Sequence, residues 1–153
     1  MEHPKSVGDR STLAIMLALR DAGYTVLLPF GENTRYDLVI DDGASLRRVQ
    51  CKTGRLRSGA VVFRACSSYA HHQNPKNTSR SYLGEIDYFA VYCRQTAGVY
   101  LIPLEEAPLT NAGSLRVTPP RNGQRRRIRM AADYEISQIS IRAKREPGAT
   151  SGA

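Results

Sequence analysis

The sequence predicts an α/β fold in which a central mixed β-sheet is flanked by helices. Residues 6–22 are rich in Leu, Ala, Met and Ile, which favour a helix, and Gly23 follows as a stop signal. From residue 24 onward, short runs of β-favouring residues alternate with turn residues. The predicted order is therefore one helix, four strands and then further strands.

The first helix carries apolar residues around most of its circumference. We therefore expect it to be buried on more than one side. Residues 24–29 (YTVLLP) form the first β-rich run after it.

Residues 35–53 read as two strands joined by a tight turn. Tyr36, Leu38 and Ile40 alternate with polar or smaller residues, the period of two that is typical of a strand. Asp42-Gly43 then predicts a hairpin, because both residue types tolerate positive φ. On the return strand, Val49 and Cys51 share one face.

The rest of the chain continues the sheet. Residues 60–65, 86–93 and 99–102 are further strand runs, and residues 104–107 begin a short helix. Between them, residues 66–81 form a polar loop without periodicity, longer than most connections. We expect one domain over residues 1–142 and a disordered tail over residues 143–153.

The charge balance favours a polyanionic partner. The 153 residues include 22 Lys and Arg against 14 Asp and Glu, a formal charge of +8. Nucleic acid is the expected partner, and no stretch is apolar enough for a membrane span. The polar N-terminus does not fit a secretory signal, so we expect a cytoplasmic protein. Three cysteines, none in C-x-x-C spacing, favour neither a disulfide framework nor a thiolate zinc site.

Three polar side chains on the central hairpin are candidates for a site of phosphodiester chemistry, and a solvated strand face is the alternative interpretation. Asp37 offers a carboxylate oxygen and Gln50 an amide oxygen, both suited to Mg²⁺. Lys52 lies two residues after Gln50, on the same face of its strand. An ammonium beside a metal ion can hold a water or stabilise charge developing on a phosphate.

The same residues resemble the signature of the PD-(D/E)XK nucleases, an Asp on one strand and then (Asp/Glu)-x-Lys on the next. Here Tyr36-Asp37 is followed by Gln50-Cys51-Lys52. Tyr36 stands where Pro is common, and Gln50 where Asp or Glu is usual. The Gln variant, together with PFGENTRYDLVIDD, VQCKTG and GEIDYFAVYC, resembles the branch associated with group I introns, which includes homing endonucleases. The resemblance covers about residues 5–105 and implies a restriction-endonuclease-like core.

The resemblance also implies an acidic residue on the first helix, often after a Gly, that reaches the metal site. Gly8-Asp9 fits that position, so Asp9 is a candidate catalytic residue and metal ligand beside Asp37 and Gln50. The alternative is an N-terminal charge favoured by the helix dipole. Glu32 has two interpretations as well, a site residue or a solvated loop residue.

Basic residues near the site and in two later segments are candidates for contacts with DNA phosphates. They are Arg55, Arg57, Arg64, Lys76, Arg80, Arg121, Arg125, Arg126 and Arg127. A solvated basic surface is the alternative interpretation.

The sequence thus predicts a DNA endonuclease that depends on Mg²⁺, with Mn²⁺ able to substitute. Because cutting two strands requires two sites, we expect a homodimer or homotetramer. Three other functions fit the same residues: a Holliday-junction resolvase, a catalytically inactive DNA-binding module, and a nuclease that acts on RNA. The neutral side chain of Gln50 gives weight to the inactive module, because it removes one negative charge from the metal site.

Overall fold

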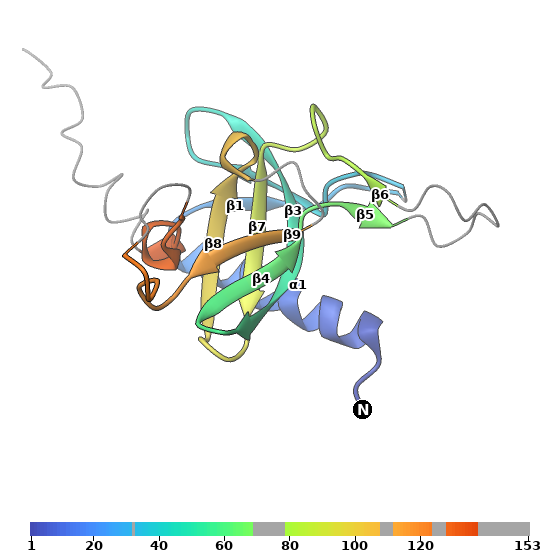
Figure 1. The fold of residues 1–153 in the computed structure, drawn as a ribbon. Coiled ribbons are helices and arrows are strands. Elements are labelled where there is room, and N and C mark those ends of the chain that lie inside the picture. Colours follow the sequence, from blue (N-terminus) through green and yellow to red (C-terminus); the bar gives the residue numbers. More distant parts are fainter. Residues whose placement is uncertain (32, 69–78, 108–111, 124–127, 138–153) are drawn as a thin grey trace, which may run out of the picture.

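A computed structural model of the protein describes residues 1–31, 33–68, 79–107, 112–123 and 128–137 (Figure 1). Side chains at residues 67, 68, 79 and 80 are also outside the description. The tail expected at residues 143–153 lies outside the described residues.

One α-helix, α1 (Pro4–Asp21), precedes the strands. The strands are β1 (Thr25–Leu27), β2 (Leu38–Asp41), β3 (Leu46–Arg57), β4 (Ala60–Arg64), β5 (Ser67–Ser68), β6 (Ser79–Arg80), β7 (Tyr88–Cys93), β8 (Gly98–Pro103) and β9 (Ala112–Arg116). Two 3₁₀ turns, η1 (Leu104–Glu106) and η2 (Ala131–Asp133), complete the described elements.

The long strand β3 changes partners along its length and so organises the sheet. Residues 46–49 pair antiparallel with β2, residues 49–54 pair parallel with β7, and residues 55–57 pair antiparallel with β4. β1 extends the sheet beyond β2, β8 pairs with β7, and β9 pairs with β4. The expectation of a mixed sheet is confirmed.

The core has two halves, one on each face of β7 and β8. On one face, Ile15 and Leu19 of α1 pack against Leu38, Val49 and Ala90. On the other face lie the apolar residues of β4 and β9 with those of β7 and β8: Val61, Phe63, Leu115, Phe89, Val91, Tyr100 and Ile102. Figure 1 shows β4 and β9 crossing in front of β7 and β8. In the described residues, strands rather than a second α-helix therefore cover this face.

Gly54 permits this crossing. A Cβ added at Gly54 would lie 2.6 Å from Cγ1 of Val61 and 2.8 Å from Cγ1 of Val91. Real side chains do not approach so closely, so β3 passes beneath β4 and beside β7 only because residue 54 lacks a side chain.

Two expectations from the sequence are wrong. α1 is buried on one side only, by Ser11, Ile15 and Leu19, while Leu13 and Leu17 are each 64% exposed. Helix composition alone does not say which faces have partners, and no described element covers the outer side of α1. The segment after Cys66 is also not wholly a loop, because β5 and β6 pair there as a two-stranded sheet.

The turn between β2 and β3 forms as predicted. Gly43 has φ of 90°, and the Asp41 carboxylate accepts the Gly43 N–H at 2.8 Å. The Asp42 carboxylate accepts the N–H groups of Ala44 and Ser45, each at 2.8 Å. These bonds from Ala44 and Ser45 hold the pKa of Asp42 below its usual range.

Candidate active site

Asp37 lies at the point where β2 leaves the β3 ladder. Its N–H donates to the Val49 carbonyl at 2.9 Å, the last such bond before the strands separate. The next free N–H on that edge of β3, that of Cys51, donates to Oδ2 of Asp37 at 2.8 Å. The carboxylate thus takes the place of a main-chain acceptor, which fixes its position against the motif strand.

The environment of Asp37 favours its protonated form. Burial raises the pKa of this carboxyl, and the bond from Cys51 and the charge of Lys52 offset the effect only in part. The side chain still reaches the surface, and Oδ1 makes no hydrogen bond to any described residue. One carboxylate oxygen is therefore available to a ligand.

Gln50 and Lys52 come from the same stretch of β3, where β7 pairs on one edge. Gln50 is half-buried, and its amide makes no hydrogen bond within the described part of the chain. The Lys52 Nζ donates to the Tyr82 hydroxyl at 3.0 Å and to the Cys66 carbonyl at 3.5 Å. The structure thus brings Asp37 and Lys52 close enough for their charges to interact, with Gln50 two residues before Lys52.

Asp9 lies in the first half of α1 and is exposed. It precedes Thr12 by three residues, which places the two about 60° apart around the helix. No hydrogen bond or ion pair joins Asp9 to the described residues of the site, so its role as a metal ligand stays a prediction.

Hydroxyl groups face β3 from α1 instead. Ser11 Oγ lies 2.6 Å from Thr53 Oγ1, and Thr12, whose hydroxyl donates to the Gly8 carbonyl at 3.1 Å, lies close enough to Cys51 to affect the pKa of its thiol. Burial, with a smaller effect of the Asp37 charge, raises the pKa of Cys51 to about 12. The thiol is therefore protonated at neutral pH and is not a ligand for a hard cation.

Four of the predicted DNA-binding arginines are described with their side chains, and all four are exposed: Arg55, Arg57, Arg64 and Arg121. Arg55 lines a cavity of about 150 Å³ with Arg10 and Arg94, between the start of α1 and β3. Arg80 belongs to β6, but its side chain is outside the description. Lys76, Arg125, Arg126 and Arg127, as well as Glu32, also lie outside the described residues.

The groups that hold Lys52 were not predicted from the sequence. Tyr82 is 4% exposed and packs edge-on against Phe89, with ring centroids 5.5 Å apart. The Arg35 guanidinium lies over the Tyr82 ring, with Cζ 4.1 Å from the centroid. No signal in the sequence points to these pairs, because Tyr82 lies thirty residues beyond Lys52 and is separated from it by the polar segment.

Comparison with known proteins identifies the family of the chain. Residues 2–137 match the family model described as PD-(D/E)XK endonuclease. The chain belongs to this family. Among solved structures, a bacterial homing endonuclease, I-Ssp6803I, has a similar fold, with a TM-score of 0.68 and 26% identity over 94% of this chain and 95% of that chain. No curated protein matches the sequence.

Membership of the PD-(D/E)XK family identifies the chain as a nuclease with a restriction-endonuclease-like α/β fold. The described residues contain no cluster of three or more His, Cys, Asp or Glu side chains that could hold a metal ion. Nor does any helix among them have the length and apolarity needed to cross a membrane.

Replacing Asp37 by Asn should stabilise the metal-free fold at neutral pH. The pKa of Asp37 is higher in the folded state than in the unfolded state, where it is about 4. The contribution of Asp37 to the free energy of unfolding is therefore complete below the unfolded-state pKa, and it is lost as the pH rises through the folded-state pKa. The amide of the variant keeps an oxygen that can accept the Cys51 N–H. Thermal unfolding in EDTA should show a higher midpoint for Asp37→Asn at pH 7 and no gain near pH 3.

Asp42→Asn is the control, because it should change stability at pH 7 in the opposite direction. The pKa of Asp42 is lowered by the bonds from Ala44 and Ser45, so the charged form stabilises the fold above the unfolded pKa. This variant should unfold at a lower temperature than wild type at pH 7. A loss of stability in Asp37→Asn at pH 7 would contradict the prediction.

Proposed function

We propose that the protein is a divalent-metal-dependent DNA endonuclease that hydrolyses phosphodiester bonds. The observation that carries the proposal is the place of Asp37, Gln50 and Lys52 at the separation of β2 from β3, in a chain of the PD-(D/E)XK family. In this proposal Asp37 and Lys52 take the Asp and Lys positions of the family signature that they resemble.

The oxygen donors present fit Mg²⁺, with Mn²⁺ as a substitute. Asp37 retains a free carboxylate oxygen, and the Gln50 amide has no described partner. Mg²⁺ binds hard oxygen ligands, keeps several waters and usually takes only one or two carboxylates, so the lack of a larger acidic cluster is compatible with it. A bound ion would supply Lewis-acid polarisation of the phosphate and activation of water.

The chain's own residues have separate roles in this proposal. Asp37 and Gln50 hold the ion, and Lys52 orients the attacking water or stabilises the negative charge that develops on the phosphate. Asp9 remains a predicted second acidic group. Its side chain is exposed and makes no described contact with Asp37 or Lys52, so that role has less support than the role of Asp37.

The preferred substrate is proposed to be a linear duplex, as for a homing or restriction enzyme. The similarity in fold to a homing endonuclease favours this choice and agrees with a place in the intron-associated branch. A Holliday-junction resolvase would use the same chemistry on a branched substrate. Since cutting two strands requires two sites, we also propose a homo-oligomer.

Cleavage assays test the proposal directly. Wild-type protein with Mg²⁺ or Mn²⁺ should cut plasmid and linear duplex DNA, and EDTA should abolish cutting. Lys52→Ala should lower the cleavage rate by at least about 100-fold, because it removes a group that acts on the reacting phosphate. DNA binding, measured in EDTA, should change little.

A four-way junction of matched sequence separates the substrates. Faster cutting of the junction than of any duplex would favour the resolvase. Salt-sensitive DNA binding without cleavage by wild type in either metal would instead identify an inactive binding module. Cleavage at the wild-type rate by Lys52→Ala would exclude the role given to Lys52.

Gln50→Glu should lower the concentration of Mg²⁺ needed for half-maximal cleavage by about tenfold. The added carboxylate gives the site a second negative charge without changing the length of the side chain. Calorimetric titration of the DNA-free protein with Mn²⁺ should show the same tightening. Unchanged ion dependence in both measurements would place Gln50 outside the ligand set.

The exposed arginines of β3 are proposed to contact DNA phosphates. Arg55 and Arg57 follow the motif on the same strand, and Arg94 adds positive charge beside Arg55. The charge of Arg10 in the same cavity is balanced by an ion pair with Glu2 at 2.8 Å. Such contacts strengthen binding without reading sequence.

For the double variant Arg55→Ala/Arg57→Ala, we plot the logarithm of the DNA association constant against the logarithm of the salt concentration. The magnitude of the slope should fall by about 2, because each phosphate contact contributes about 0.9 to it. Arg47→Ala is a matched control. Arg47 is exposed on the same strand, eight residues before Arg55. Along an extended strand this spacing separates the two residues by about 26 Å. Equal slopes for wild type and the double variant would contradict the assignment.

A further inference from the structure

We propose that Tyr82 is a positioning residue that fixes the Lys52 ammonium for catalysis. The inference rests on the proposed nuclease function of Lys52. Tyr82 itself is 4% exposed, and it acts through the hydrogen bond that its hydroxyl accepts from Nζ of Lys52 at 3.0 Å.

The contacts of Lys52 leave one donor free. An ammonium group carries three hydrogens in fixed tetrahedral directions. One is donated to the Tyr82 hydroxyl and another to the Cys66 carbonyl, 3.5 Å away. No other acceptor for Nζ occurs among the described residues. With two directions fixed by the protein, the third N–H has a defined direction and is available to a water or a phosphate oxygen.

Fixing a lysine side chain in this way matters because a free one is mobile. Its four-carbon stem has many rotamers, and this rotamer freedom would be lost on reaching the transition state. When the fold already holds the ammonium in place, this rotamer entropy is lost on folding and no longer adds to the barrier of the reaction step. The effect of Tyr82 should therefore appear in kcat.

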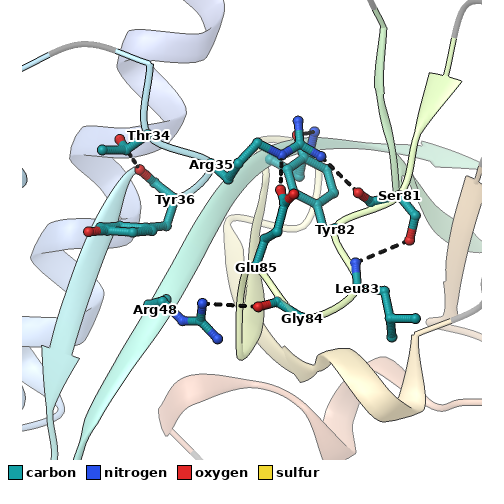
Figure 2. A network of polar contacts seen from close by, with 10 residues as sticks. Thr34, Arg35, Tyr36, Arg48, Ser81, Tyr82, Leu83, Gly84 and Glu85 are labelled. Carbon is teal, nitrogen blue, oxygen red and sulfur yellow. Dashed lines mark hydrogen bonds and ion pairs between the residues drawn. The ribbon is translucent and has the colours of Figure 1, made fainter.

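Tyr82 is itself held on two sides, as a positioning residue must be. Its ring edge meets Phe89 at an interplanar angle of 89°, and the Arg35 guanidinium stacks on its face. Figure 2 shows how Arg35 is fixed in turn, by an ion pair with Glu85 and a bond to the Ser81 carbonyl at 2.9 Å. The hydroxyl therefore has little freedom to move away from Lys52.

Both acceptors lie at the base of the segment that contains β5 and β6. The chain enters this segment just after Cys66 and returns from it just before Tyr82. In Figure 1 the two short strands project to the side of the main sheet, beyond β3. Lys52 is thus held where this projecting segment joins the core.

A purely structural role makes a different prediction. A buried tyrosine hydroxyl needs a partner, and its loss would lower stability wherever it lies in the core. Tyr100 provides the comparison. It is 5% exposed, belongs to the same half of the core, and its hydroxyl lies 2.9 Å from Thr96 Oγ1, away from Lys52.

The test compares Tyr82→Phe with Tyr100→Phe in the full-length protein. Both changes keep the ring and remove one buried hydroxyl, so both should lower the unfolding temperature by similar amounts. Tyr82→Phe alone should lower kcat, by about tenfold, with KM and DNA affinity within twofold of wild type. An unchanged kcat in Tyr82→Phe, or an equal fall in Tyr100→Phe, would overturn the inference.

A second readout does not depend on activity. The sequence has only four lysines, so NMR of lysine labelled with ¹³C at Cε can resolve Lys52, identified by its absence in Lys52→Arg. An immobile side chain gives two distinct Cε hydrogen shifts, which should merge in Tyr82→Phe and persist in Tyr100→Phe. If wild-type Lys52 gives the averaged signal of a free lysine, the inference is wrong. Absence of cleavage by wild type would count against the nuclease function, whereas this signal tests the position of Lys52 by itself.

Discussion

The hydrogen bond from the Cys51 N–H to the Asp37 carboxylate links the fold to the site. Where β2 separates from β3, a main-chain donor loses its partner on the neighbouring strand, and main-chain N–H groups in folded proteins are nearly always paired. Asp37 supplies the acceptor from its side chain at 2.8 Å. The same bond that closes the ladder therefore holds a carboxylate beside Gln50 and Lys52, and the separation of the strands gives a ligand access to them.

Few acidic groups among the described residues surround that bond, and this determines the charge of the site. Asp37 is opposed by Lys52, Gln50 is neutral, and α1 presents Ser11 and Thr12 to β3 rather than a carboxylate. Burial also raises the pKa of Asp37. A cation therefore meets at most one negative charge from these residues, a weaker attraction than the two carboxylates of the usual family signature would give.

Local patterns in the sequence predicted the features that depend on neighbouring residues. The alternation through Ile40 and the Asp42-Gly43 pair identified the hairpin, and the spacing of Gln50 and Lys52 placed them on one strand face. Long-range contacts could not be predicted in this way. The exposure of Leu17 depends on which elements pack on α1, and the crossing of β4 over β7 depends on space at Gly54. The contact of Lys52 with Tyr82 joins residues whose separation carries no periodic signal.

In the proposed enzyme, only Asp37 and Gln50 are assigned as protein ligands of the metal ion. Mg²⁺ sites with one or two protein oxygens are commonly completed by substrate phosphates and water. With Asp37 and Gln50 as donors, DNA would supply oxygen ligands and negative charge that the protein lacks. Binding of the ion and binding of DNA would then strengthen each other by the same factor, as linkage requires. Lys52, already held by Tyr82 and Cys66, needs no rearrangement when both arrive. In this proposal a weak metal site is a means of limiting cleavage to the DNA-bound state.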